Sequence, residues 1–467
     1  MSAFPLDPSR FAPDDGAPAT PLRVISADAF SEAEKKLPQA ARDWLKASGF
    51  SPKAGKQALL PDGAGGVIAL ALVEPKGARL ADPFAAGRLP AALPAGRYRL
   101  DVGEESDALA FLLGSYRFAR YKNAPDRARL IAPAGMDAAR IERVAAAIAL
   151  GRDLINTPAN DLGPQELEDA ARGLAGRHGA SVDVVNGDAL RQGFPLIAAV
   201  GRASPRAPRL IDLRLGAEGP RVTLVGKGVV FDTGGLDIKP SSAMALMKKD
   251  MGGAATALAA ADMLMGEMAA GGGPRIRLRV LIPVVENAVA GEAFRTSDVY
   301  RSRKGLTIEI GNTDAEGRLI LADALAYACE EAPDLLIDFA TLTGAARVAL
   351  GPQLPPLYSD DDELAEALAA TGREVDDPVW RLPLHAPYDG LLDSKIADLN
   401  SAPGGGMAGS IVAALFLRRF AEGAKAWAHL DIYGWTPKER PGRPEGGEPQ
   451  AARLVAAYLS RRYGAAR

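Results

Sequence analysis

The segment LTIEIGNTDAEGRLILADALAYACEEA at residues 306–332 joins two kinds of local structure through a short polar loop. Its first part, LTIEIG, is typical of a β-strand, and its last part, RLILADALAYACEEA, has the Ala- and Leu-rich pattern of a helix. Between them, NTDAEGRL at 312–319 places Asp314 and Glu316 where the strand gives way to the helix. In parallel α/β sheets, functional side chains collect in loops of this kind.

The same alternation of strand and helix patterns continues through most of the chain. Ala-rich helical stretches lie between several strand candidates, and this order favours a largely parallel sheet with helices on both faces. The strand candidates after residue 160 are 221–226, 276–285, 306–311, 334–340 and 427–434.

The N-terminal part has a mixed α/β pattern of its own, with strand candidates at 66–73 and 98–103. A long helical pattern then leads into the second part of the chain. We therefore predict an α/β protein with two domains and a connecting helix. The predicted parts are a smaller N-terminal α/β domain at 1–135, a linking helix at 136–160, and a larger C-terminal domain at 161–467 with a mostly parallel central sheet flanked by helices.

The composition is that of an ordinary globular protein, with 48% hydrophobic residues, 24% charged residues and a net charge of −3. So small a net charge gives no global field for nucleic acid or an anionic membrane. The single cysteine, Cys329, excludes an intramolecular disulfide and cysteine-type zinc sites. Residues 1–22 lack a secretory pattern, and no apolar run approaches the roughly 18–20 residues that span a bilayer. We expect a cytoplasmic protein without a membrane role.

Three glycine-containing loops carry charged residues next to apolar strands or helices. They are GKGVVFDTGGLDIKPS at 226–241, MKKDMGGAA at 247–255 and GNTDAEGRL at 311–319, with the charged members Lys227, Asp232, Lys239, Asp250, Asp314 and Glu316. Carboxylates two residues apart in an extended or turning segment can point to the same side. Four carboxylates in one crevice could not all stay ionised without compensation, which two divalent cations would supply. The pattern is therefore compatible with a two-metal site.

Each of these residues also has an ordinary structural explanation. Asp232 could be a turn residue, and Asp250 could cap a helix. Asp314 and Glu316 could favour a helix N-terminus through its dipole. The lysines could be solvated, and the G-K-G of the first loop lacks the spacing of a phosphate-binding loop. No histidine pair or serine-nucleophile motif is present, and His429 is predicted to be a core residue. Spacing alone leaves these alternatives open.

Taken together, the three loops resemble the leucine aminopeptidase family, also called the cytosol aminopeptidase family of dizinc metallopeptidases. NTDAEGRL is the signature octapeptide of that family and is intact. Further family segments follow in family order, namely VGKGVVFDTGG, IKPS, MKKDMGGAA, VVENAVAGEAFRTSDV and DFATLTGA. The resemblance covers about residues 150–440, and the N-terminal third matches weakly, mainly at GSYRFARYK. By this resemblance, 161–467 is a catalytic metallopeptidase domain.

The resemblance implies a metal-dependent aminopeptidase that removes the N-terminal residue, leucine or another mainly apolar one, from peptides through a metal-bridged water. It implies two divalent metal ions per chain, Zn²⁺ and/or Mn²⁺, and a bicarbonate bound at Arg318 as general base. Lys239 would stabilise the oxyanion of the tetrahedral intermediate. The implied metal ligands are Lys227, Asp232, Asp250, Asp314 and Glu316. The implied lining of the pocket for the first side chain is Met247, Thr341 and Gly344.

The resemblance also bears on partners. Relatives are hexamers, which implies a homohexamer that acts on peptides. Some bacterial relatives bind DNA, and arginines cluster at 117–128 and 202–214, so an additional DNA-binding architectural or regulatory role is the alternative function. Nucleic acid is nevertheless not the expected partner, because many acidic residues accompany these arginines in the N-terminal third.

Four features depart from the usual family pattern. Thr233 stands where serine is usual, which keeps a hydroxyl. Lys249 stands beside an implied ligand, and Asp237 stands shortly before Lys239. We interpret both as peripheral, with Asp237 facing solvent. The glycine-rich loop at 403–414 contains added small residues. Since this loop flanks the substrate pocket in relatives, the preferred N-terminal residue stays open.

Overall fold

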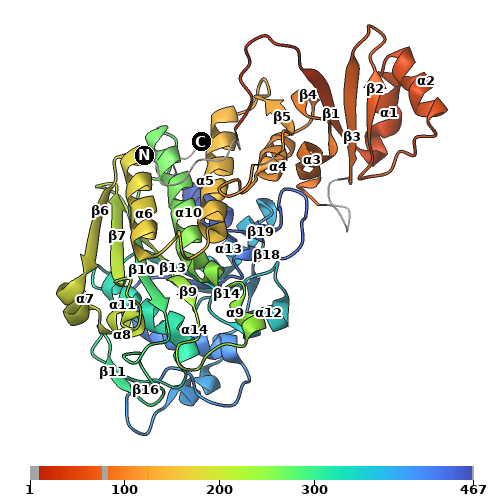
Figure 1. The fold of residues 1–467 in the computed structure, drawn as a ribbon. Helices are drawn as coiled ribbons and strands as arrows, with labels where there is room; N and C mark the ends of the chain where they lie inside the picture. Colours follow the sequence, from red (N-terminus) through yellow and green to blue (C-terminus); the bar gives the residue numbers. More distant parts are fainter. Residues whose placement is uncertain (1–9, 76–81, 124, 465–467) are drawn as a thin grey trace. The chain divides into compact units, whose positions relative to one another are not determined.

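The computed structural model describes residues 10–75, 82–123 and 125–464, and it shows an α/β protein (Figure 1). Predictions that extend to the chain ends, including part of 1–22, lie outside the described residues. In the described part of the chain, no helix is long and apolar enough to cross a membrane.

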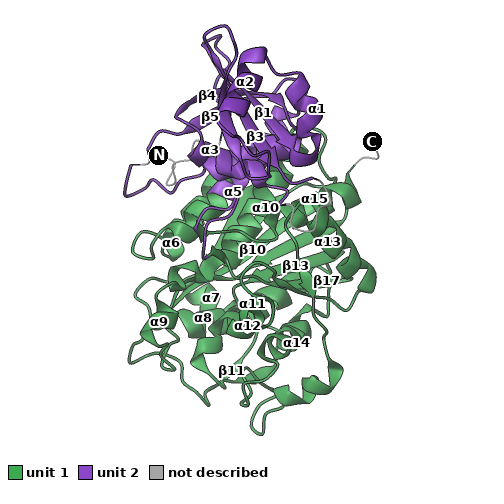
Figure 2. Cartoon of the chain, turned by 90° about the vertical axis from the view of Figure 1, so that its right-hand side faces the viewer, with its two compact units in different colours: residues 1–5, 150–436, 446–467 green, residues 6–149, 437–445 purple. Residues whose placement is uncertain are grey.

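The described residues form two compact units (Figure 2). The smaller unit contains residues 10–149 and 437–445, and the larger unit contains residues 150–436 and 446–464. The division falls within helix α5, Ala138–Asn156, which occupies most of the predicted linking region. The segment 437–445, far along the sequence, thus packs with the N-terminal unit.

The smaller unit has five strands, which are β1 Thr20–Ser26, β2 Gln57–Pro61, β3 Val67–Val73, β4 Gly96–Val102 and β5 Ala128–Ile131. They form one sheet in the order β2-β3-β1-β4-β5. β2 and β3 are an antiparallel hairpin, and the remaining pairs are parallel. The helices of this unit before α5 are α1 Phe30–Lys35, α2 Gln39–Ala47, α3 Leu89–Ala92 and α4 Glu105–Ser115. The predicted α/β character of this part is confirmed.

The larger unit is built on a nine-stranded sheet. Its strands are β6 Ser181–Asn186, β7 Arg209–Leu215, β8 Arg221–Gly226, β9 Gly228–Asp232, β10 Arg277–Asn287, β13 Leu335–Ala340, β14 Pro356–Tyr358, β15 Trp380–Arg381 and β17 Trp427–Asp431. They follow the order β15-β14-β17-β13-β8-β10-β7-β6, with β9 also beside β10. The central pairs are parallel, whereas β6 with β7, β7 with β10, and β14 with β17 are antiparallel. This confirms the predicted mostly parallel central sheet.

Helices cover both faces of this sheet (Figure 2). The helices of this unit after α5 are α6 Pro164–His178, α7 Gly187–Gly193, α8 Pro195–Gly201, α9 Ser241–Met244, α10 Gly252–Ala269, α11 Glu316–Cys329, α12 Gly344–Leu350, α13 Asp362–Glu374, α14 Gly409–Ala421 and α15 Ala452–Tyr463. α10 and α15 pack on one face, and α11, α8 and α14 on the other. All six residues of β13 are therefore buried, which explains its continuous apolar sequence.

The strand predicted at 306–311 does not join the central sheet. It is the short strand β12, Thr307–Glu309, which pairs with β11 Val299–Arg301 and β16 Leu399–Asn400 in a separate three-stranded sheet. Only Ile308 of this strand is buried, so the segment does not have the two buried faces of a central strand. The loop NTDAEGRL thus follows a strand of this small sheet and lies near the carboxyl end of β9 in the central sheet.

Candidate active site

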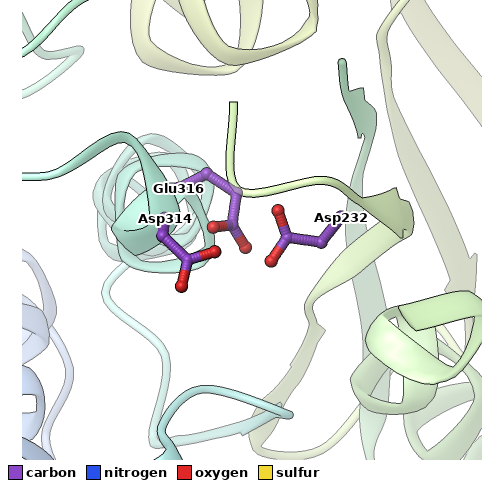
Figure 3. A group of neighbouring side chains, drawn as sticks. All are labelled: Asp232, Asp314 and Glu316. Atoms are coloured by element: carbon purple, nitrogen blue, oxygen red, sulfur yellow. The ribbon is translucent and has the colours of Figure 1, made fainter. Parts of the chain in front are cut away.

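Three carboxylates converge near the carboxyl ends of the parallel strands (Figure 3). Asp232 is the last residue of β9, Asp314 lies in the 3-10 turn η4 (Thr313–Ala315), and Glu316 begins α11. One oxygen from each lies within 4.8 Å of the others. Asp232 and Glu316 are buried, whereas the side chain of Asp314 keeps 34% exposure. We call these three residues the carboxylate cluster.

The fourth predicted carboxylate reaches the cluster through a lysine. Lys227 lies between β8 and β9, and its Nζ is 2.9 Å from Glu316 Oε1 and 2.7 Å from Asp250 Oδ2. Asp250 belongs to the 3-10 helix η3, Met247–Met251, and both Lys227 and Asp250 are buried. The five residues predicted as metal ligands thus form one continuous group.

A second lysine borders the same cluster. Lys239 Nζ lies 2.8 Å from Asp232 Oδ2 and is also paired with Asp314. The side chain of Lys239 is 13% exposed, so its ammonium group contacts the buried carboxylates and is also partly accessible to solvent. Four carboxylates therefore share two ammonium groups, which leaves an excess of negative charge.

Burial and the negative charges of neighbouring carboxylates raise the pKa values of two members of the carboxylate cluster. Burial raises the pKa of Glu316 well above its usual range, and the charge of Asp232 raises it further. Burial and Asp232 together raise the pKa of Asp314 to about 6. Burial alone would lower the pKa of Lys227, but Asp250 and Glu316 outweigh it, so that pKa is raised. Among the protein groups alone Lys227 is a cation, and a role as ligand requires a metal charge to displace its proton.

The donor set fits divalent cations. Glu316 Oε2 is buried and accepts no hydrogen bond from the described residues. A buried carboxylate oxygen without a donor is costly, and a cation at that position removes the cost. Carboxylate oxygens on a strand end, a turn and a helix start are ligands that hard or borderline dications accept.

Two glycines make room for Lys227. A Cβ on Gly317 would lie 2.6 Å from Lys227 Cε, and a Cβ on Gly253 would lie 2.1 Å from Phe339 O. The backbone of Lys227 is held on both sides, because its N donates to Phe339 O and its O accepts from Ala254 N, each at 2.9 Å. The glycines of NTDAEGRL and MKKDMGGAA therefore have steric reasons for their positions.

Asn287 is a site residue that the sequence reasoning missed. It ends β10, is fully buried, and donates from Nδ2 to Asp232 Oδ1 at 2.8 Å and to Thr313 O at 3.1 Å. Its position two residues after the predicted strand at 276–285 was the available signal. Asp237 is exposed as expected, but it is not merely solvated, since its Oδ2 accepts from Thr313 N at 2.7 Å. Both residues fix the turn that presents Asp314.

Asp431, at the end of β17, organises the neighbouring turn. Its Oδ1 accepts from Leu342 N at 3.0 Å and Thr343 N at 3.2 Å, and its Oδ2 accepts from Thr343 Oγ1 at 2.7 Å. Thr341, just before this turn, donates to Asp250 Oδ1 at 2.8 Å, and its carbonyl accepts from Lys227 Nζ at 2.9 Å. The sequence reasoning gave Asp431 no role, yet it supports the segment that contains a predicted pocket residue.

The remaining predicted site residues surround this group. Arg318 is 8% exposed, donates from Nη1 to Ser401 O at 2.7 Å, and has an Nε without an acceptor among the described residues. Burial lowers the pKa of Arg318 to about 10. Met247 is half-buried at the start of η3, which also carries Asp250, and Gly344 is exposed at the start of α12, shortly after Thr341. Both therefore lie in segments that also hold site residues.

Two residues outside the predicted site are deeply buried. Lys249 was interpreted as peripheral, but it is only 2% exposed and its Nζ lies 4.7 Å from the centre of the Tyr433 ring. Burial lowers the pKa of Lys249 to about 7. The interpretation was wrong because η3 turns this side chain inward. His429 is a core residue as predicted, with Nδ1 2.5 Å from Asp338 Oδ1.

Comparisons with known proteins agree with this geometry. The model of the cytosol aminopeptidase family, catalytic domain, matches residues 149–456, and the M17 aminopeptidase N-terminal domain matches 20–133. A probable cytosol aminopeptidase of Geobacter sp. (strain M21) is 41% identical over 77% of this chain and 75% of its own length.

Solved structures show the same architecture. The cytosol aminopeptidase from Coxiella burnetii is 45% identical, has a TM-score of 0.89, and is matched over 96% of this chain and 98% of its own. The bottromycin maturation enzyme BotP in complex with Mn is 33% identical, with a TM-score of 0.84 over 96% of this chain and all of its own. The chain therefore belongs to the cytosol aminopeptidase family of metallopeptidases.

Proposed function

We propose that this chain removes the N-terminal residue from peptides by metal-assisted hydrolysis with two divalent metal ions. The observation that carries the proposal is the convergence of Asp232, Asp314 and Glu316 in one mostly buried group. Family membership supports aminopeptidase activity, and the complex of BotP with Mn supports Mn²⁺ as one usable metal. Zn²⁺ is equally compatible with a lysine and carboxylate set.

The proposed ligands fall into two groups, one for each metal ion, with Glu316 between them. This residue lies between Asp314 on one side and the Lys227–Asp250 pair on the other, which supports a bridging role between two ions. We assign a second bridging role to Asp232. Asp314 then serves one ion, and Lys227 with Asp250 serves the other. When bound, two such ions polarise the scissile carbonyl and lower the pKa of the attacking water.

Lys239 and Arg318 supply positive charge from the protein itself. Burial alone would lower the pKa of Lys239, but Asp232 and Glu316 outweigh it, so the side chain is an ammonium ion at neutral pH. Such a group beside the cluster is suited to stabilise negative charge that develops on the carbonyl oxygen. The buried guanidinium of Arg318, with a free Nε donor, is suited to hold a bicarbonate that accepts a proton from water.

The first side chain of the peptide is proposed to lie against Met247, Thr341 and Gly344. None of these groups is charged, which favours leucine and other apolar residues at the N-terminus. Thr341 is fixed relative to the ligands through its hydrogen bond to Asp250, so the pocket and the metals would keep a constant spacing. A cytoplasmic homohexamer is the proposed assembly, on resemblance to the family, and light scattering after gel filtration would test its mass.

The metal dependence is tested with the full-length protein and Leu-p-nitroanilide. We expect two divalent ions per chain after loading, loss of hydrolysis on chelation, and recovery with Mn²⁺ or Zn²⁺. Undiminished hydrolysis by the chelated protein would overturn the metal mechanism.

The ligand assignment is tested with Asp314→Ala. We expect hydrolysis to be lost while the circular dichroism spectrum is unchanged. Glu363→Gln is the matched control, because it removes an exposed carboxylate from the first turn of α13 and should leave activity intact. Full activity of the Asp314 variant would refute its place among the ligands.

A further inference from the structure

A cavity of about 530 Å³ lies at the other end of the strands that lead to the carboxylate cluster. β8 begins at Arg221 and runs toward Lys227, and β10 begins at Arg277 and runs toward Asn287. The cavity is lined at the beginnings of these two strands, by the end of β7, and by residues that follow α11. It is therefore separate from the site described above. We call it the arginine cavity.

Strand register gathers four arginines in this cavity. Arg221 and Arg277 are direct partners across the parallel pair β8–β10. Arg279 and Arg214 are direct partners across the antiparallel pair β10–β7. Because side chains two residues apart point to the same face of a strand, Arg277 and Arg279 stand on one face of β10. Like charges placed directly opposite one another destabilise a sheet unless something compensates them.

Two of the arginines are compensated by protein carboxylates. Arg279 Nη2 lies 2.7 Å from Asp212 Oδ2, and Arg214 Nη2 lies 2.9 Å from the same atom. Glu331 Oε1 lies 2.7 Å from Arg214 Nη2 and 3.1 Å from Arg279 Nη1. Arg279 is only 4% exposed, so this buried guanidinium and its partners form a fixed wall of the cavity.

The other two arginines have no such carboxylate. Arg221 Nη1 donates to the carbonyl of Glu331 at 2.7 Å, and Arg277 Nε donates to the carbonyl of Gly219 at 2.8 Å. Within the described residues, neither guanidinium has a carboxylate within ion-pair distance. Nearby Asp334 is paired through Oδ1 with Lys425 at 2.6 Å, and its Oδ2 accepts from the backbone N of Arg221 at 2.8 Å. Glu330, also in the lining, is already paired with Arg303 at 2.7 Å. Among the described residues, the four guanidinium groups of the arginine cavity thus share Asp212 and Glu331, which leaves an excess of two positive charges.

We propose that the arginine cavity binds a small phosphate-bearing anion. Guanidinium groups match phosphate oxygens with paired, charge-assisted hydrogen bonds, and two neighbouring arginines can hold one phosphate or a diphosphate. The volume lies within the range of small-molecule sites, and Thr223 on β8 adds a hydroxyl to the lining. The anion would remove the repulsion between Arg221 and Arg277. Inorganic phosphate and the phosphates of a nucleotide share this chemistry.

Calorimetric titration of the full-length protein with pyrophosphate at constant ionic strength tests the proposal. We expect saturable binding at one site per chain, with phosphate and a nucleoside diphosphate as further arms that distinguish the two sources. Arg277→Gln and Arg221→Gln should each weaken pyrophosphate binding about tenfold or more, because each removes a charge-assisted contact. Arg191→Gln, on exposed α7 of the same unit, is the control and should leave binding unchanged.

A conservative variant and a stability measurement distinguish loss of the binding site from loss of the fold. Arg277→Lys retains the charge without the forked donors and should lose less affinity than Arg277→Gln. Arg221 is exposed and Arg277 half-exposed, so both variants should keep the wild-type melting temperature within a few degrees. Binding no stronger than that of chloride, or equal binding by all variants, would overturn the proposal. Tighter binding of a DNA duplex than of pyrophosphate through these arginines would overturn it in favour of a nucleic-acid surface.

Discussion

Helix α11 carries two buried carboxylates that are held in opposite ways. Glu316 begins the helix and Asp323 lies about two turns further on, with 1% and 0% exposure. Asp323 accepts from three backbone N–H groups, those of Leu196 at 2.8 Å, Ile197 at 3.3 Å and Arg303 at 2.8 Å. Glu316 Oε2 accepts none from the described residues, and two further carboxylates lie beside it. Burial is thus nearly the same, whereas the hydrogen-bond donors and the neighbouring charges differ.

The difference in donors distinguishes Asp323, which stabilises the fold, from Glu316, which is a proposed metal ligand. Asp323 joins the start of α8 to the segment around Arg303, and each of its oxygens has a donor. Glu316 is paired directly with one lysine, Lys227, and the negative charges of neighbouring carboxylates raise its pKa. A buried acid that the protein leaves short of donors is a candidate ligand, whereas one surrounded by N–H groups is a structural support.

The largest expected effect comes from Glu316→Gln. The change keeps the shape of the side chain but removes a charge from the proposed bridging position, so hydrolysis of Leu-p-nitroanilide should fall more than about 10³-fold. In chelator, the melting temperature should stay level or rise, because one repulsive charge is gone. Retained activity, or a large loss of stability, would contradict the distinction drawn between the two acids.

Asp323→Asn should produce the reverse pattern. The amide places an NH₂ group against at least one backbone N–H, so the free energy of unfolding should fall by about 1–3 kcal/mol. The kcat/KM of the folded variant should stay within about threefold of wild type, because the ligands are not altered. Thermal melts and kinetics measured on the same preparation would check this. A large loss of kcat/KM with unchanged stability would contradict the structural role and indicate that Asp323 takes part in catalysis.

Stability should depend on pH differently with and without metal. The pKa values of Glu316 and of Asp314, about 6, are raised in the folded state, so their contribution is fully present at low pH and is lost as pH rises through those values. In chelator, the melting temperature should therefore fall between about pH 4 and 7. Burial also raises the pKa of Asp323, to about 7, and adds to this fall.

Saturating Mn²⁺ should remove the part of that fall that belongs to the cluster. Metal at a hundred times its Kd stabilises the folded state by about 2.7 kcal/mol, and more at high pH, where protons no longer compete. Glu316→Gln serves as the control, because its melts should respond less to both pH and metal. Identical pH curves with and without metal would contradict the assignment.

The smallest expected effect is that of Asp431→Asn. This acid is satisfied by donors, like Asp323, yet three of its donors belong to the turn after Thr341, and the fourth is the hydroxyl of Ser410 on α14. Losing one acceptor should shift that turn and lower kcat/KM about tenfold, chiefly through KM, while the fold is kept. Thr343→Ser, which keeps the hydroxyl donor to Asp431, should behave like wild type. Equal losses in the two variants would remove the positioning role.

Local motifs were enough to predict the acids and lysines of the site, because each follows a strand or begins a helix within a short, recognisable loop. Asn287 and Asp431 could not be found in that way, since their roles depend on which strands become neighbours. The burial of Lys249 in η3 was missed because the ring that its side chain contacts, Tyr433, is distant in the sequence. The central parallel sheet followed from the alternation of patterns, but the separate pairing of Thr307–Glu309 did not, because a short strand does not reveal its partner.

The side chain of Lys227 fills the space beside Gly317, and this has a consequence for how the site is assembled. The Lys227 chain passes where any side chain at Gly317 would stand, so the first turn of α11 and the β8–β9 junction must close around each other. Neither segment can complete its final packing before the other arrives. We therefore expect the carboxylate cluster and Lys227 to reach their final positions in one late, cooperative step of folding. Gly317→Ala should slow that step, while the smaller unit folds at its usual rate.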